Sequence, residues 1–104
     1  MSAPHGSTTG RPIMQLLDLM GRRWALRVMW ELYQQPGLSF RALQERCETI
    51  SPSVLNTRLA ELRGARIVEL SDGYALTAAG RELACRLMPL HYWAEEHFKD
   101  TPES

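Results

Sequence analysis

The stretch SPSVLNTRLAELRGARIVELSDGYALT, residues 51–77, contains the signals that decide the fold. Ser51 offers a hydroxyl that can cap a helix, and Pro52 follows at the first helical position, where its missing N–H costs nothing. The apolar residues at helical spacing after this start are Leu55, Leu59 and Leu62. The sequence therefore predicts a helix over residues 51–63 that buries one leucine face.

A hairpin is predicted directly after this helix. Residues 66–70 predict one strand and residues 74–76 a second, with Asp72-Gly73 between them as a two-residue turn. Thr77 then caps a long final helix. The inward residues of that helix are expected to be Leu83, Leu87 and Leu90.

Three helices are predicted upstream. Residues 13–20 are apolar on nearly every side, so this helix needs neighbours in more than one direction. The helix predicted over residues 22–35 places Glu31 on its solvated stripe and ends at a Pro-Gly pair. Ser39 caps the third helix. The residues expected to be buried in the second and third helices are Ala25, Val28, Met29, Leu32, Phe40, Leu43 and Cys47.

The order of these elements predicts the fold class. Two short helices joined by a tight turn, with a hairpin directly after them, are the layout of a winged helix-turn-helix. The chain is therefore expected to be mainly α with a small β-hairpin. A length of 104 residues suits one domain, which we place at residues 13–98 between disordered tails at 1–12 and 99–104.

Composition and charge narrow the class of protein. The chain has no net charge, but residues 11–66 hold nine arginines against five acids, and residues 67–104 hold three basic residues against seven acids. The basic part, residues 11–66, can therefore bind phosphate, while the acidic part, residues 67–104, is suited to a different role. No apolar run is long enough to span a membrane, no signal peptide is seen, and two cysteines fit a reducing compartment. We expect a cytoplasmic protein.

The outward face of the helix over residues 51–63 is small and polar. With the leucines inward, Ser53, Thr57 and Ala60 point directly outward, and arginines lie at the margins. A helix with such side chains can approach base edges in the major groove, while its arginines contact phosphate or guanine. The residues expected to face DNA are Ser51, Ser53, Asn56, Thr57, Arg58 and Arg63, with Arg41 from the helix before.

Two other interpretations stay open. Similar polar positions occur on any solvated helix surface, and only their combination with the helix-turn-helix layout and the local positive charge favours DNA. The alternative function is a winged-helix module that binds another protein through the same face. The zero net charge and the acid at the hairpin tip support that alternative.

The sequence does not indicate a catalytic, cofactor-binding or metal-binding site. The spacing suggests no serine–histidine–acid set, glycine-rich phosphate loop or carboxylate pair, so we expect no enzyme and no cofactor. His91 and His97 fall on different faces of a helix and form no metal-binding pair. Cys47 and Cys85 are expected to be inert small hydrophobes.

Five segments together resemble one known family, the HxlR-type winged-helix regulators of bacteria, which are related to the MarR-type regulators. The segments are LLDLMGRRWALRVMWEL (16–32), LSFRALQE (38–45), ISPSVLNTRLAELRGARIVE (50–69), YALTAAGREL (74–83) and WAEEH (93–97). The resemblance implies a homodimeric transcription factor that pairs through its first and last helices. It also implies that the residues facing DNA include Ser51, Ser53, Asn56, Thr57 and Arg58. We expect the dimer to bind a palindromic operator in double-stranded DNA and to repress transcription.

Apolar side chains near both termini favour the same dimer, because one small core cannot cover them all. The residues expected at its interface are Ile13, Leu16, Leu17, Met20, Leu87, Leu90 and Trp93. The sequence departs from the family in its short wing, where we expect Asp72 and Gly73 to tolerate substitution with little loss of DNA affinity. It also lacks the reactive cysteine that redox-sensing members carry at the first helix. The sequence does not identify a small-molecule effector.

Overall fold

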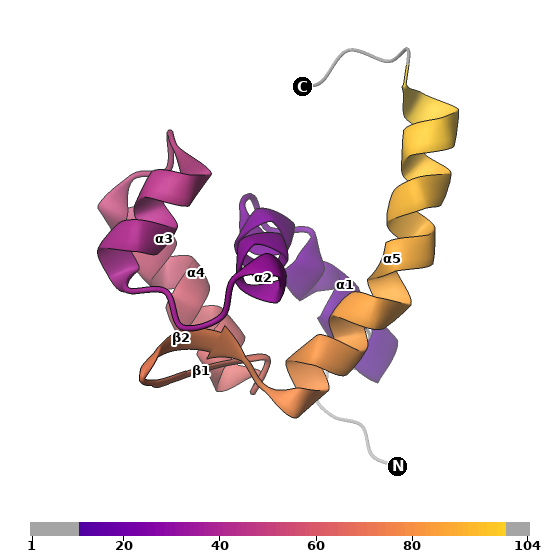
Figure 1. Cartoon of the computed structure of the whole chain (residues 1–104). Coiled ribbons are helices and arrows are strands. Elements are labelled where there is room, and N and C mark those ends of the chain that lie inside the picture. The colour runs from indigo at the N-terminus through magenta and orange to yellow at the C-terminus, as the bar shows by residue number, and fades with distance from the viewer. Residues whose placement is uncertain (1–10, 100–104) are drawn as a thin grey trace.

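The computed structural model describes residues 11–99 and confirms the predicted fold, five helices and one antiparallel hairpin (Figure 1). The elements in chain order are α1 (Pro12–Met20), α2 (Ala25–Gln34), α3 (Phe40–Cys47), α4 (Pro52–Gly64), β1 (Val68–Ser71), β2 (Gly73–Leu76) and α5 (Ala78–Phe98). The predicted tails fall largely outside the described residues. Pro12, assigned to the first tail, instead opens α1 at a position where proline is favoured.

The core lies between α2, α3, α4 and the hairpin. Each of these elements contributes fully or nearly fully buried apolar side chains, as the helical spacing predicted. The largest of them are Leu32, Leu43, Leu55, Leu59, Leu62, Val28 and Cys47. Because α4 places all three of its leucines in this core, its opposite face is fixed toward solvent.

Three helix starts are confirmed by their caps. The Ser39 Oγ accepts a hydrogen bond from the Ala42 N–H at 3.1 Å, and the Ser51 Oγ accepts one from the Val54 N–H at 3.2 Å. The Thr77 Oγ1 accepts one from the Gly80 N–H at 2.9 Å. Each cap satisfies an N–H that the helix itself cannot pair, so the chain enters α3, α4 and α5 at a defined residue.

The second helix begins later than predicted. Residues 21–24 form a turn, and Trp24 adopts a left-handed backbone with φ of 77° before α2 starts at Ala25. Glu31 is also not on a solvated stripe, since it is only 8% exposed. Its burial follows from the packing of α3 across this part of α2, which the period of α2 alone does not reveal.

The hairpin is one residue tighter than predicted. Ser71 pairs with Gly73, so Asp72 alone forms the tip. Gly73 has a φ of 87°, which lets the chain reverse at this point. Tyr74 exchanges backbone hydrogen bonds with Leu38 on the other side of β2, and these bonds hold the register.

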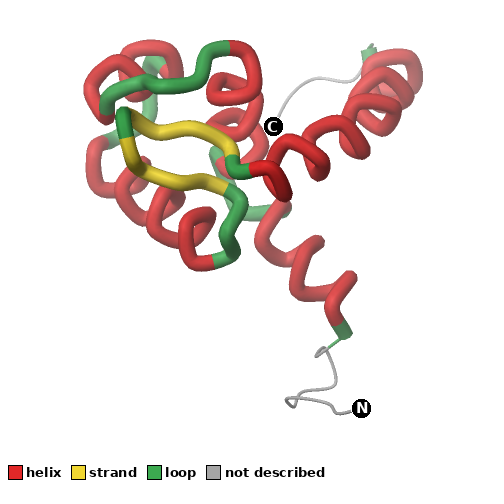
Figure 2. The backbone as a smooth tube through the Cα atoms, turned by 60° about the horizontal axis from the view of Figure 1, so that its bottom comes forward, coloured by secondary structure: helices red, strands yellow, loops and turns green. Residues whose placement is uncertain are grey.

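Helices α1 and α5 project from the body formed by the other elements (Figure 2). Within α5 only Gly80 and Ala84 are buried. Leu90, expected to point inward, is 58% exposed, because it lies at the wall of an open groove between α2 and α5 and not in the core. Met20, expected at a dimer interface, is buried in the core at the end of α1.

Candidate nucleic-acid interface

The exposed side of α4 carries the polar side chains that the leucine spacing assigned to it. Five of them, with the cap residue included, form a continuous exposed strip that we name the polar face of α4. Its members are Ser51, Ser53, Asn56, Thr57 and Arg63. Ala60 is exposed beside them and adds no bulk. The strip is therefore shaped for close approach of another surface to the helix backbone.

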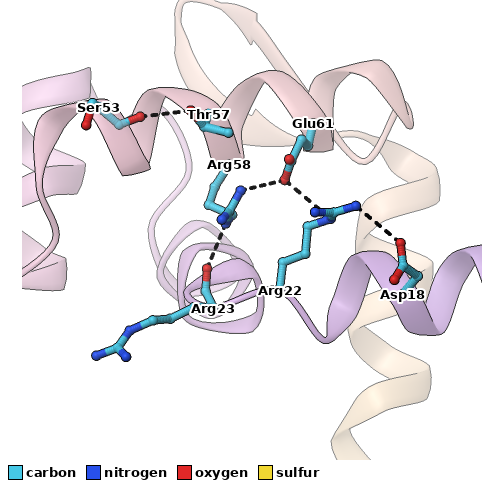
Figure 3. A network of polar contacts seen from close by, with 7 residues as sticks. All are labelled: Asp18, Arg22, Arg23, Ser53, Thr57, Arg58 and Glu61. Atoms are coloured by element: carbon cyan, nitrogen blue, oxygen red, sulfur yellow. Dashed lines mark hydrogen bonds and ion pairs between the residues drawn. The ribbon is translucent and has the colours of Figure 1, made fainter.

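Hydroxyl groups at the start of α4 are held by local hydrogen bonds. The Thr57 Oγ1 donates to the Ser53 carbonyl at 3.0 Å (Figure 3). The Ser51 and Ser53 hydroxyl oxygens lie 3.5 Å apart. These bonds restrict the rotamers while leaving the oxygens able to accept further hydrogen bonds. The side chains are thus ordered before any partner arrives.

Arg58 lies apart from the polar face of α4. Its Nε donates to the Arg23 carbonyl at 2.8 Å, and its Nη1 donates to the Glu61 carboxylate at 2.8 Å (Figure 3). The side chain is only 17% exposed. The structure therefore turns this guanidinium toward the turn before α2, whereas the sequence placed it at the margin of the outward face as a candidate DNA contact.

The other two candidate arginines are open to solvent. Arg63 is exposed in the last turn of α4. The Arg41 side chain is 88% exposed on α3, and its Nε lies 3.6 Å from the Glu45 carboxylate in a loose ion pair. An exposed pair of this kind contributes little to stability, so Arg41 can exchange its partner at low cost.

A buried carboxylate fixes α3 against α2. The Glu31 oxygens accept hydrogen bonds from the Arg27 Nε at 2.8 Å and from the Arg46 Nε at 2.9 Å. Arg27 also donates to the Arg46 carbonyl, and its hydrogen bond with Glu31 raises the Arg27 pKa above its ordinary value. This cluster positions α3 and was missed at the sequence level. Arg27, four residues before Glu31, was the available signal.

The wing carries an acid at its tip. Asp72 is the exposed tip of the hairpin, and the Gly73 Cα faces the Gly37 backbone. A Cβ at position 73 would lie 2.5 Å from the Gly37 carbonyl oxygen. Substitution of Gly73 is therefore expected to cost stability, because the left-handed backbone and this close approach both require glycine, while its effect on DNA affinity stays a prediction.

An apolar groove runs between α2 and α5. It encloses a cavity of about 660 Å³ whose walls include Leu26, Trp30, Tyr33 and Leu87. Trp30 stacks on His91 of α5 with ring centroids 5.5 Å apart. The groove lies on the side of α2 from which α5 projects, so it belongs to a surface separate from the polar face of α4.

The interface residues predicted near the termini divide into two groups. Ile13, Leu17, Leu90 and Trp93 are exposed, while Leu16 and Leu87 are partly buried and pack on the core. Tyr92 and Phe98 add further exposed aromatic surface to α5. The exposed members of this set give α1 and α5 an apolar surface that no other part of residues 11–99 covers.

The cysteines occupy different environments. Cys47 is buried in the core, and this burial raises the pKa of its thiol above the ordinary value of 9.0. Cys85 is exposed on α5, where its proximity raises the pKa of the Tyr33 hydroxyl. In the part of the chain that the structure describes, no group of three His, Cys, Asp or Glu residues could hold a metal ion. Over the same residues, no helix is long and apolar enough to cross a membrane.

A short helix, a second helix with an exposed polar face, and a hairpin define a winged helix-turn-helix protein of the DNA-binding class. The family model for the HxlR-like helix-turn-helix matches residues 19–102. The chain belongs to this family and is a DNA-binding transcriptional regulator. A search of curated proteins found no significant match.

Solved structures agree with this assignment. The quinone-bound transcriptional regulator YodB from B. subtilis is 29% identical with a TM-score of 0.75, over 81% of this chain and 96% of that chain. An HxlR-family structure from Thermoplasma volcanium is 24% identical with a TM-score of 0.74, over 86% of each chain. A MarR-family regulator from Enterococcus faecalis is 24% identical with a TM-score of 0.71, over 92% of this chain and 96% of that chain. At 24% identity, the Thermoplasma and Enterococcus structures support the winged helix-turn-helix fold alone.

Proposed function

We propose that two copies of the chain bind a palindromic operator, each with α4 in one major groove, and that this binding represses transcription. The observation that carries the proposal is the division of α4 into a fully buried leucine face and an exposed face of small polar side chains. Repression follows when a dimer seated on a promoter competes with the polymerase for the same DNA. A regulator of this kind is expected in the cytoplasm.

Within α4, we assign base contacts to Asn56 and Thr57. Both side chains are exposed on the polar face of α4, and an amide or hydroxyl can donate to and accept from base edges. Ser51 and Ser53 lie at the N-terminus of α4, where backbone N–H groups favour a phosphate. Arg63 and Arg41 lie exposed at the margins and are assigned to the phosphate backbone.

The dimer is assigned to α1 and α5. Exposed apolar side chains on both helices are costly in water, and a two-fold interface would cover the same patch on each copy. The residues assigned to it are Ile13, Leu16, Leu17, Leu87, Leu90 and Trp93. Residues 13–98 would then serve as one functional domain. In such a dimer, the two α4 helices would contact half-sites that lie about one turn of the DNA double helix, or a multiple of it, apart.

A small-molecule effector is a second element of the proposal. YodB is known in a quinone-bound form. In this chain the groove between α2 and α5 has the size and apolar lining typical of small-molecule sites. The effector's identity does not follow from this lining.

The proposal is tested by selecting bound duplexes from a random DNA pool with the purified chain. A consensus with two related half-sites, bound with an affinity that falls steeply as salt rises, is the expected result. Recovery of no consensus would refute sequence-specific binding. It would favour the alternative, a winged-helix module that uses the polar face of α4 to bind a protein.

A further inference from the structure

Among the described residues, Arg58 is the candidate DNA contact whose side chain bonds to a distant segment of the chain, whereas the bonds of Ser51, Thr57 and Arg41 stay within their own helices. Its two bonding nitrogens reach two different partners, the carbonyl of Arg23 in the turn before α2 and the carboxylate of Glu61 one turn further along α4. Both distances are 2.8 Å, within the range of strong charge-assisted hydrogen bonds. The side chain therefore connects α4 to a segment 35 residues earlier in the chain.

The turn that Arg58 contacts is strained. The Arg23 carbonyl directly precedes Trp24, whose φ of 77° is costly for a residue with a Cβ. This turn sets the direction in which α1 leaves α2. A hydrogen bond to the Arg23 carbonyl stabilises the turn and at the same time ties it to α4.

The polar contacts continue from α4 to α1. Arg22 lies between them, with its Nε 3.9 Å from the Glu61 carboxylate and its Nη2 3.2 Å from the Asp18 carboxylate (Figure 3). These outer pairs are longer and more exposed than the pair of Arg58 with Glu61. Exposed pairs contribute little, so Arg58 carries most of the connection.

We propose that Arg58 is a positioning residue, which fixes α4 relative to the turn between α1 and α2 and does not contact DNA phosphate. The proposal rests on the proposed function, because it assumes that α4 is the helix that enters DNA. In the proposed dimer, α1 belongs to the interface and α4 to the groove. The angle between them sets the distance between the two recognition helices.

A lysine substitution separates the two roles of an arginine. A phosphate contact needs a positive charge within reach, which an ammonium also supplies. The positioning role needs two nitrogens that point in different directions, which the guanidinium fork supplies and the ammonium does not. Arg63, exposed on the same helix, provides the matched control.

The experiment measures binding of wild type, Arg58→Lys, Arg58→Ala, Arg63→Lys and Arg63→Ala at several salt concentrations. The probes are the duplex that wild type selects from a random pool and a scrambled duplex of the same composition. Arg58→Lys is expected to lose about tenfold in its preference for the selected duplex, with its salt slope unchanged. Arg63→Lys keeps the charge at its assigned phosphate contact, so its salt slope is expected to stay, whereas Arg63→Ala removes one phosphate contact from each of two copies and is expected to flatten the log–log salt slope by about 1.8 on both duplexes.

Two outcomes would overturn the positioning role. One is an Arg58→Lys variant that keeps the wild-type preference, and the other is an Arg58→Ala variant whose salt slope flattens as much as that of Arg63→Ala. All binding is measured well below each variant's thermal midpoint, so that loss of folded protein does not contribute.

Amide hydrogen exchange in the DNA-free protein supplies a readout that does not depend on DNA. Arg58→Lys is expected to speed exchange in the first turn of α2, residues 25–28, while Leu59 and Leu62 stay protected. Unchanged exchange in that turn would refute the inference. A wild-type chain without preference between the duplexes would instead refute the proposed function, and the exchange result would then decide the inference alone.

Discussion

Helix α4 and the distal half of α5 both present a full helix face to solvent, but the two faces are chemically opposite. On α4 every leucine is buried, and the exposed positions carry hydroxyls, an amide and a guanidinium. Beyond Ala84, α5 exposes Leu90, Tyr92 and Trp93. A polar face loses little by staying in water, whereas an apolar face gains by being covered. The comparison supports the proposal that α4 contacts nucleic acid and that α5 contacts protein.

The largest expected effect comes from placing a charge on the apolar face. Leu90→Asp should leave the fold intact, because the side chain is already exposed, but should prevent two copies from pairing. Loss of the second half-site contact should weaken operator binding by about a hundredfold or more. Light scattering at tens of micromolar and a binding titration measure both effects.

Leu70→Asp is the matched control for this change. Leu70 is an exposed leucine on β1, outside the proposed interface, so its variant should remain dimeric and bind DNA as wild type does. A Leu90→Asp variant that stays dimeric would show that the apolar face of α5 has no such partner.

The next largest effect is expected from the polar face of α4. Asn56→Ala or Thr57→Ala should relax base preference at specific operator positions by about 1–3 kcal/mol each, because a base contact is lost without loss of fold. In a dimer the affected positions should appear once in each half-site. Repeating the duplex selection with each variant measures this, with Gln34→Ala as a control at an exposed position of α2. Variants that keep the wild-type consensus would exclude α4 as the recognition helix.

The hairpin belongs neither to the polar face of α4 nor to the apolar face of α5. Substitutions in it should change the free energy of unfolding more than the DNA affinity. Gly73→Ala should lower the free energy of unfolding by about 1–3 kcal/mol, because a Cβ there meets the Gly37 carbonyl on a left-handed backbone. Asp72→Ala at the exposed tip is the control and should leave both the thermal midpoint and DNA affinity nearly unchanged. A large loss of DNA affinity in Asp72→Ala would mean that the wing contacts DNA.

The smallest effect is expected at the two thiols, of which Cys47 lies in the core behind α4 and Cys85 on α5. Burial raises the Cys47 pKa, so little reactive thiolate is present near neutral pH. Mild oxidant should therefore leave DNA affinity unchanged, and Cys85→Ser should bind normally. A loss of binding under oxidant that reductant restores would contradict this prediction.

Local signals account for what could be predicted from the sequence. The caps at Ser39, Ser51 and Thr77 involve residues three positions apart, and the buried leucines of α4 follow from one helical period. Short-range chemistry of this kind does not depend on where the rest of the chain lies. The starts of α3, α4 and α5 and the polar face of α4 were predicted for this reason, and the DNA role of that face remains a prediction.

Long-range contacts account for what could not be predicted. Glu31 is buried because α3 brings Arg46 to it, and Arg58 turns inward because the Arg23 carbonyl lies within reach. The hairpin register depends on Leu38, which precedes β2 by more than thirty residues. Met20 is buried because other helices supply the core residues that surround it. None of these partners can be identified from the spacing within one element.

The long α5 helix has a consequence for how the protein responds to dilution. Its two buried residues, Gly80 and Ala84, lie in the first two turns, so the distal turns have little of their own chain to stabilise them. In the proposed dimer these turns gain their stability from the second copy. That contribution follows mass action, so it grows with the concentration of the protein itself. The amount of regulator in a cell would then set how much of its last helix is ordered.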